Sequence, residues 1–158
     1  MTHRINFEGL FSLKDRIALV SGASSGLGAH FAEVLSGAGA HVVVAARRAD
    51  KLTDLVKKLR EQGAKADAIA MDVTSRESVQ EAFQTFDSQF SRLDILVNNA
   101  GIANPPLRFV DATEDDWGPV LDVNLTGAWR VAQAAARRMK QQRNRTIENT
   151  ISIYNHRF

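Results

Sequence analysis

The sequence predicts an α/β fold, a three-layer doubly wound parallel sheet that is incomplete and has about five strands. Two observations support this fold class. Short apolar runs alternate with longer amphipathic stretches from residue 16 to the end of the 158-residue chain. The first run, RIALVSG at 16–22, is rich in branched apolar residues and stops at glycine, as a buried strand does. Strands that alternate with helices in this way form a parallel sheet with helices on both faces.

The apolar runs are predicted to be the strands of the sheet. They lie at 16–22, 41–47, 65–73, 93–101 and 146–153. The second run, HVVVAAR, consists almost wholly of apolar residues, which is typical of a strand buried on both faces. The third run, KADAIAMDV, carries the least pronounced pattern of the first four.

The amphipathic stretches are predicted to be helices. They cover 26–38, 50–63, 75–90 and 113–141. We expect Asp50 to cap the start of the second helix and Gly63 to stop it, and Ser75 to cap the third. An interruption of the last helix is expected at Gly118 and Pro119, because proline removes a backbone donor.

Length and composition indicate one soluble globular domain over 1–158, with 1–12 as a loose N-terminal segment. The formal net charge is +2, from 20 Lys and Arg against 18 Asp and Glu, so nucleic acid is not expected as a partner. The basic run at 137–145 is interpreted as a solvated helix end.

Cysteine is absent, which excludes disulfides and thiolate chemistry and fits a reducing compartment, so we expect a cytoplasmic protein. No apolar run approaches the ~18 residues of a membrane span, and the N-terminus has no signal-peptide pattern. We therefore expect no membrane association. No metal site is predicted either.

A glycine-rich segment, SGASSGLG at 21–28, joins the first strand to the first helix. Its glycines follow the spacing G-x-x-x-G-x-G, which differs from the G-x-G-x-x-G of many dinucleotide-binding loops. Glycine still permits a tight turn and close backbone approach to a pyrophosphate, which the N–H groups of the helix start then bind. An ordinary glycine-rich turn is the alternative interpretation.

The second strand ends at Arg47 and Arg48. An acidic residue at this point would bind a ribose 2′-hydroxyl, whereas arginine forms charge-assisted bidentate bonds to a 2′-phosphate. The two arginines therefore favour NADP(H) over NAD(H), although they could also be surface residues at a helix entry.

Further polar residues are expected at the same rim of the sheet, where ligands of open parallel sheets bind. The loop NNAG at 98–101 follows the fourth strand, and Asp72 and Val73 end the third. Asparagine side chains and a close-approach glycine can satisfy ribose and adenine groups. Either feature alone would be a routine loop.

Together, SGASSGLG, the DV at 72–73, NNAG and DVNLTG at 122–127 resemble the short-chain dehydrogenase/reductase family in order and spacing. The resemblance implies a Rossmann-like fold, NAD or NADP, reversible hydride transfer between a carbonyl and an alcohol, and homo-oligomeric relatives. It implies that the glycine loop holds the pyrophosphate, Asp72 and Val73 flank the adenine, NNAG lines the ribose side and Arg47 or Arg48 meets the 2′-phosphate. The implied cofactor residues are Gly22, Ser24, Ser25, Gly26, Leu27, Gly28, Arg47, Arg48, Asp72, Val73, Asn98, Ala100 and Gly101.

The resemblance also implies a catalytic Asn, Ser, Tyr and Lys. Asn124 and Ser152 match the first two, but no Tyr-x-x-x-Lys is present. Tyr154 is the only tyrosine, and Phe158 stands four positions after it. A phenol with a pKa near 10 is a poor base at neutral pH without a neighbouring cation. We therefore expect a C-terminally truncated or frame-shifted chain that is inactive by itself.

Two functions remain open from the sequence. The first is an NADP(H)-dependent oxidoreductase whose complete form acts on a small-molecule ketone or secondary alcohol, of the 3-oxoacyl reductase or sugar-alcohol dehydrogenase type. The second is a non-catalytic remnant that binds dinucleotide or a partner. A structural protein that binds no nucleotide would differ from both in failing to bind NADPH.

Overall fold

The strands of the computed structural model form one parallel sheet, as the sequence predicts. The structure describes residues 9, 11–103, 108–140, 142 and 145–150. The strands are β1 (Ile17–Ser21), β2 (His41–Ala46), β3 (Ala66–Ala70), β4 (Ile95–Asn98) and β5 (Thr146–Asn149). Their order is β3-β2-β1-β4-β5, and every neighbouring pair is parallel. The order reverses between β1 and β4, so a crevice is expected at their carboxyl ends.

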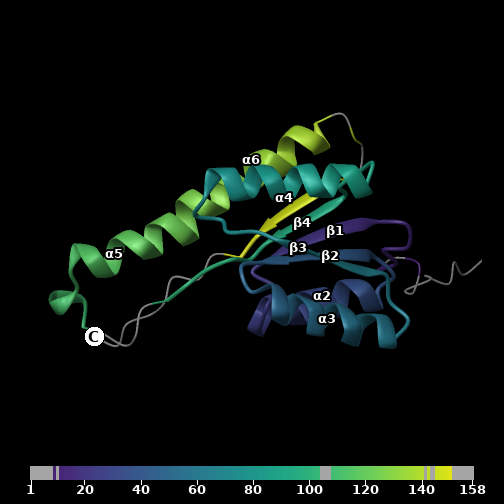
Figure 1. Ribbon diagram of the computed structural model, residues 1–158, viewed down its shortest axis with the longest axis horizontal. Coiled ribbons are helices and arrows are strands. Elements are labelled where there is room, and N and C mark those ends of the chain that lie inside the picture. Colours follow the sequence, from purple (N-terminus) through teal and green to yellow (C-terminus); the bar gives the residue numbers. More distant parts are fainter. Residues whose placement is uncertain (1–8, 10, 104–107, 141, 143–144, 151–158) are drawn as a thin grey trace, which may run out of the picture.

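Helices cover both faces of this sheet, which confirms the three-layer arrangement. The helical elements are α2 (Gly26–Gly37), α3 (Ala49–Glu61), α4 (Arg76–Gln89), the 3-10 turn η1 (Phe109–Asp111), α5 (Glu114–Leu121), the π-helical η2 (Asp122–Gly127) and α6 (Ala128–Met139). Helices α2 and α3 lie on one face, α4 and α6 lie on the other, and α5 extends past the sheet (Figure 1). Among the described residues, no helix combines the length and apolar character needed to span a membrane.

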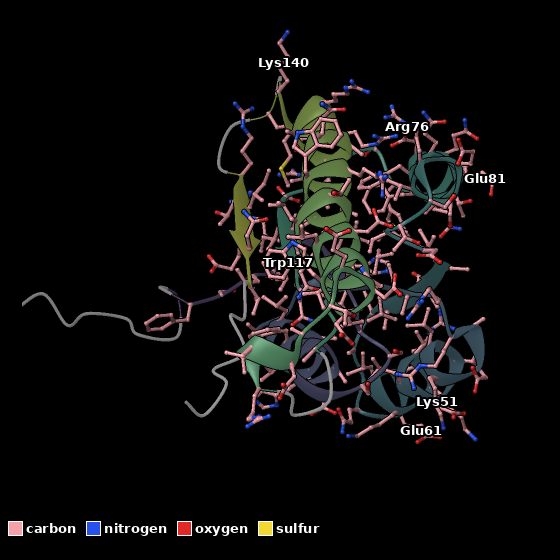
Figure 2. The ribbon with its side chains drawn as sticks, turned by 90° about the vertical axis from the view of Figure 1, so that its left-hand side faces the viewer. Lys51, Glu61, Arg76, Glu81, Trp117 and Lys140 are labelled. Carbon is pink, nitrogen blue, oxygen red and sulfur yellow. The ribbon has the colours of Figure 1, made fainter. Side chains whose placement is uncertain are left out.

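Each face has its own hydrophobic core. Leu52 and Leu59 of α3 pack against β2 on one face, and Phe83 and Phe86 of α4 pack with Val131 of α6 on the other. Leu52 and Leu59 are seven positions apart and Phe83 and Phe86 are three apart, spacings that place each pair on one side of its helix. The opposite sides carry charged residues, and Figure 2 shows Lys51 and Glu61 of α3, and Arg76 and Glu81 of α4, pointing outward.

The predicted helix ends agree with the structure at two of three positions. Ser75 caps α4 by accepting a hydrogen bond from the Ser78 N–H at 3.1 Å. Gly63 ends α3 with a φ of +84°, which glycine adopts without steric cost. The prediction of Asp50 as the cap of α3 is wrong, because α3 begins at Ala49 and Asp50 lies in its first turn. An acid there still interacts favourably with the helix dipole.

The predicted interruption at Gly118 and Pro119 is also wrong in position. Both residues lie within α5, and the helix changes to π geometry only at Asp122. The φ of proline is compatible with a helix, so the lost N–H donor costs a hydrogen bond without breaking the chain direction. A π segment holds one extra residue within a helical turn and often occurs at a functional site.

A buried carboxylate joins the amino ends of β1 and β4. Asp94, whose side chain is 1% exposed, accepts hydrogen bonds from the Ile17 N–H at 3.0 Å, from Arg16 at 3.1 Å and from Arg92. Burial raises the pKa of Asp94, but the hydrogen bonds from Arg92, the Ile17 N–H and Arg16 outweigh it and lower the pKa below its ordinary value.

We expect Asp94→Asn to lower the free energy of unfolding at pH 7 by about 2–3 kcal/mol, because it leaves buried donors poorly paired. The lowered pKa of Asp94 contributes stability above the unfolded-state value of about 3.9, and this is lost as pH falls through the folded-state pKa. Urea unfolding between pH 7 and pH 3 should therefore show a shallower acid loss for Asp94→Asn than for wild type. The exposed Asp54→Asn is the control. Equal acid slopes for all three proteins would contradict the assignment.

Candidate functional site

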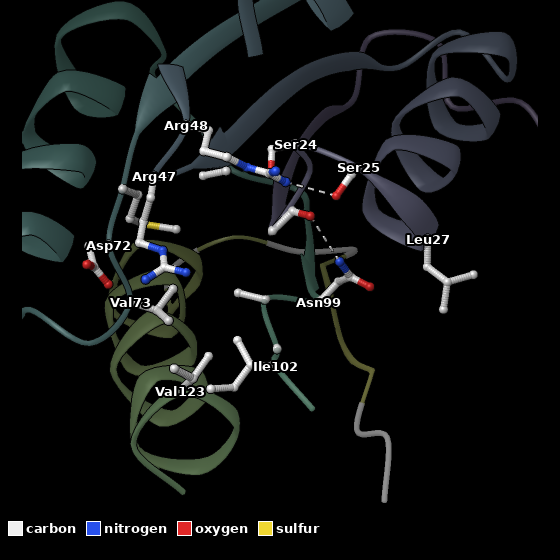
Figure 3. Close-up of a pocket in the computed structure, with 15 residues that line it drawn as sticks. Ser24, Ser25, Leu27, Arg47, Arg48, Asp72, Val73, Asn99, Ile102 and Val123 are labelled. Atoms are coloured by element: carbon white, nitrogen blue, oxygen red, sulfur yellow. Dashed lines mark hydrogen bonds between the residues drawn. The ribbon is translucent and has the colours of Figure 1, made fainter. Parts of the chain in front are cut away.

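A pocket of about 650 Å³ opens at the carboxyl ends of the strands, where the strand order reverses. Figure 3 shows its residues coming from the loops after β1, β2, β3 and β4 and from η2. Ten of the thirteen predicted cofactor residues line it: Gly22, Ser24, Ser25, Leu27, Arg47, Arg48, Asp72, Val73, Ala100 and Gly101. Predicted residues as far apart in sequence as Gly22 and Gly101 thus meet in one pocket, at the edge of the sheet where ligands of open parallel sheets bind.

Three predicted cofactor residues do not line the pocket. Gly26 begins α2 and Gly28 lies in its first turn, behind the pocket wall. Asn98 is 2% exposed, and its amide donates to the Ala128 carbonyl at 2.7 Å and to Asn149 Oδ1 at 3.1 Å. Asn98 therefore connects β4 to α6 and β5, while its neighbour Asn99 lines the pocket.

Sequence reasoning missed five lining residues. They are Ala46, Met71, Asn99, Ile102 and Val123. Ala46 and Met71 are adjacent to predicted residues in sequence, and Asn99 follows Asn98, which is predicted in its place. Val123 lies in η2, and its position depends on the path of that segment, which the predicted helix break did not capture.

The hydroxyl of Ser21 holds the ends of β1 and β4 together. Ser21 is fully buried, and its hydroxyl accepts from the N–H groups of Asn99 at 3.0 Å and Ala100 at 3.1 Å. It donates to Asn98 Oδ1 at 3.2 Å. One hydroxyl thus satisfies three polar groups at the end of β4. The pocket floor depends on this side chain.

Glycine is required where the loop after β1 contacts the loop after β4. Gly22 has a φ of +67°, and a Cβ there would lie 2.6 Å from the Ala100 Cα. A Cβ at Gly28 would lie 2.4 Å from the Gly22 carbonyl oxygen and 2.6 Å from Asn99 Nδ2. Gly26 has a φ of +59° but open space around it. Gly28 thus permits close packing and Gly26 supplies a left-handed conformation.

The two arginines after β2 take different positions at the pocket rim. Arg48 donates through Nη2 to the hydroxyls of Ser24 at 2.8 Å and Ser25 at 3.0 Å. Arg47 points instead toward Asp72 and Val73 (Figure 3). Positive charge therefore borders the pocket on both the glycine-loop side and the β3 side.

Asp72 carries the negative charge of the pocket. Its Oδ1 accepts from the N–H of Thr74 at 2.9 Å and from the Thr74 hydroxyl at 2.7 Å. Burial raises the pKa of Asp72, but these two hydrogen bonds and the charge of Arg47 outweigh it, so the pKa lies below its ordinary value. The group is an anion at neutral pH and can accept a hydrogen bond from a ligand.

Asn124, predicted as a catalytic residue, lies in η2 and contacts the loop after β4. Its Oδ1 accepts from the Ile102 N–H at 2.8 Å, and its Nδ2 donates to the Ile102 carbonyl at 2.8 Å. The side chain thus pairs with both backbone groups of Ile102 and fixes this loop against η2. Ser152, the second predicted catalytic residue, and Tyr154 lie outside the described residues.

The start of α2 is suited to an anion. Its N-cap, Ser25, makes no side-chain capping bond, and the first turn contains no acidic residue. Its N–H groups are therefore available to a ligand, and the helix dipole favours negative charge there. Leu27 on one side, and Ile102 and Val123 on the other, add apolar surface to the pocket (Figure 3). This combination can bind an elongated ligand with a phosphate group and a flat apolar ring.

Comparison with known proteins identifies the same arrangement elsewhere. The sequence profile of the short chain dehydrogenase family matches residues 16–157. The chain is 34% identical over 141 residues to the 3-oxoacyl-(acyl-carrier-protein) reductase FabG of Thermotoga maritima, covering 89% of this chain and 57% of that protein. It is 35% identical over 149 residues to sorbose reductase sou1 of Schizosaccharomyces pombe, covering 93% and 58%. The chain therefore spans a little over half the length of these curated relatives.

Solved structures agree with the sequence matches. A short-chain type dehydrogenase/reductase from Mycobacterium marinum superposes with a TM-score of 0.82 at 37% identity, over 87% of this chain and 54% of that one. A gluconate 5-dehydrogenase from Burkholderia cenocepacia, solved in complex with NADP and tartrate, gives a TM-score of 0.76 at 38% identity, over 82% and 50%.

The glycine contacts predict different costs for substitution at three positions. We expect Gly28→Ala to lower the free energy of unfolding by about 2 kcal/mol or more, because the new Cβ meets backbone at Gly22. Gly26→Ala should cost about 1 kcal/mol through its positive φ alone. Gly37→Ala, at the end of α2 with open space around it, is the control and should be neutral or slightly stabilising. Urea denaturation of the three variants measures this order, and a Gly28→Ala protein as stable as Gly37→Ala would refute the packing argument.

Proposed function

The chain belongs to the short chain dehydrogenase family, and from this we propose that it is an NADP(H)-dependent oxidoreductase acting on CH–OH groups, of which these 158 residues carry the cofactor site. One observation carries the proposal: the pocket brings the uncapped start of α2, the glycine loop and two arginines to one rim of the sheet. The NADP complex of the Burkholderia relative supports the same choice of cofactor.

The residues present fit such a cofactor. The close approach of Gly22 to Ala100 and of Gly28 to Gly22 leaves a backbone-lined cradle that any Cβ would disrupt. In our proposal, the segment 22–28 binds the pyrophosphate through backbone N–H groups at the start of α2. Ala100 and Gly101 border the ribose side, and Asn98 supports them from behind.

The remaining assignments concern the adenine half. Asp72 and Val73 flank the adenine, with the Asp72 carboxylate available to accept a hydrogen bond. Arg47 and Arg48 bind the 2′-phosphate, because a guanidinium forms strong charge-assisted bonds to phosphate oxygens. We assign Arg47 the larger share, since the guanidinium of Arg48 already bonds the hydroxyls of Ser24 and Ser25.

Bound NADP(H) supplies a hydride that is exchanged between its nicotinamide ring and a carbonyl or secondary alcohol carbon. The chain's own residues bind the nucleotide and fix its orientation. Asn124 holds the loop after β4 in place through Ile102 and so positions the side of the pocket that follows Gly101. The substrate is proposed to be a small ketone or its alcohol, since named relatives include a 3-oxoacyl reductase and a sorbose reductase.

A second candidate function is dinucleotide binding without catalysis. It is favoured by one observation in the sequence: the 158 residues contain a single tyrosine, Tyr154, with Phe158 rather than lysine four positions on. General acid–base transfer to a carbonyl oxygen at neutral pH needs a group whose pKa is brought near that pH. We propose that the polypeptide 1–158 by itself binds cofactor and does not turn it over.

We expect the purified 158-residue polypeptide to bind NADPH, with enhanced cofactor fluorescence on titration. No NADPH oxidation above the buffer rate is expected when ketones such as sorbose or a 3-oxoacyl thioester are added, because the acid–base group is missing. Gly28→Ala, which disrupts the cradle, is the binding control. Turnover at a useful rate would overturn the non-catalytic candidate, and absence of NADPH binding would overturn the cofactor site itself.

Arg47→Asp should weaken NADPH binding about tenfold or more, while NADH binding changes by less than about threefold, because a cation is replaced by a repelling charge only at the 2′-phosphate. Equilibrium titrations at fixed ionic strength measure both dissociation constants. Lys51→Asp, an exposed charge reversal in the first turn of α3, controls for long-range charge effects. Equal losses for NADPH and NADH would refute the proposed preference.

A further inference from the structure

Arg130, in the first turn of α6, contacts the turn that follows β3. Its Nη1 donates to the Thr74 carbonyl at 2.8 Å and to the Val73 carbonyl at 3.2 Å. The same nitrogen bonds Asp122 Oδ1 at 3.2 Å. One guanidinium nitrogen from α6 therefore joins the turn at 73–74 to Asp122, the first residue of the π-helical segment.

Val73 and Thr74, whose carbonyls accept hydrogen bonds from Arg130, both contribute to the geometry of the pocket. Val73 lines it directly. Thr74 donates both its N–H and its hydroxyl to Asp72 Oδ1, so the position of Thr74 fixes the direction of the Asp72 carboxylate. Arg130 itself is not among the lining residues. Its influence on the pocket passes through the backbone of Val73 and Thr74.

A second contact in the same place is independent of charge. Gly127, the last residue of η2, packs so closely on Val73 that an added Cβ would lie 2.7 Å from Val73 Cγ2, 3.0 Å from its Cβ and 3.1 Å from its carbonyl oxygen. The backbone of Gly127 is ordinary helix, with a φ of −63°, so only packing requires glycine here. Val73 is thus contacted twice, by the backbone of Gly127 at the end of η2 and by the side chain of Arg130 in α6.

We propose that Arg130 is a positioning residue for the adenine half of the nucleotide, which it aligns by holding the Val73–Thr74 turn against the helix. The inference rests on the proposed cofactor site. It adds a residue from α6, outside the pocket, to the groups that set its geometry. Loss of Arg130 frees two carbonyls and the Asp122 carboxylate, so the turn and the Asp72 carboxylate lose their fixed direction.

The helix offers a matched control. Arg138, two turns further along α6, donates to the Asp87 carboxylate of α4 at 2.6 and 2.7 Å and to the Ala134 carbonyl at 2.8 Å. Arg138 thus also joins α6 to the rest of the protein, but it does so through α4. Neither Arg138 nor Asp87 lines the pocket. Arg138→Ala therefore removes a comparable stabilising contact without touching the Val73–Thr74 turn.

The test titrates the 158-residue polypeptide and its variants with NADPH and with 2′,5′-ADP, which carries the adenine half alone. Arg130→Ala should raise both dissociation constants by the same factor, about tenfold, because the defect lies in the half that the two ligands share. Arg138→Ala should change both by less than about twofold, although we expect thermal unfolding to show that each variant is destabilised. If Arg130→Ala does not fold, Gly127→Ala takes its place and should likewise raise both dissociation constants by the same factor.

Each contrary outcome is distinct. Folded Arg130→Ala that binds both ligands within twofold of wild type would overturn the assignment, as would a loss for NADPH that 2′,5′-ADP does not share. If Gly127→Ala is used instead, unchanged affinity for both ligands would also overturn the assignment. Failure of the wild-type polypeptide to bind either ligand would overturn the proposed cofactor site, and this inference with it.

Discussion

The close approach of the carboxyl ends of β1 and β4 is the constraint on which the candidate site depends. These strands are parallel neighbours in the sheet. Ser21 bonds Asn98, the last residue of β4, and the N–H groups of the two residues after it, while Gly22 lies against Ala100. A parallel sheet opens a crevice at such a point, and its depth depends on how tightly the two loops meet. Here the buried hydroxyl of Ser21 and the lack of a side chain at Gly22 together set that depth.

The two halves of the pocket are built by different means. On the side of the glycine loop, backbone packing dominates, and Arg48 bonds the neutral hydroxyls of Ser24 and Ser25. On the side of β3, ionised and hydrogen-bonded groups dominate, with Asp72 held by Thr74 and Thr74 held in turn by Arg130. The first half tolerates no added volume at Gly22 and Gly28, whereas the second depends on an unbroken series of polar contacts.

Most of the fold and much of the site could be predicted from the sequence, because both follow from local patterns. Apolar runs identified the strands, and the motifs that resemble the short-chain dehydrogenase/reductase family identified ten lining residues. Asn98 is predicted to face the ligand, but Asn99 lines the pocket, because the Asn98 side chain bonds α6 and β5. The role of Arg130 could not be predicted, because its acceptors are backbone carbonyls that lie 56 and 57 residues away.

The π-helical stretch accommodates one residue more than an α-helical turn would. Successive residues of an α-helix are offset by about 100°, so an extra residue in α-helical geometry would rotate α6 by roughly that angle relative to α5. The wider turn at 122–127 absorbs the extra residue, which keeps Val131, Ala135 and Met139 on the hydrophobic layer that they fill. Removal of one residue from this stretch should therefore restore α-helical geometry there and leave the packing of α6 in place.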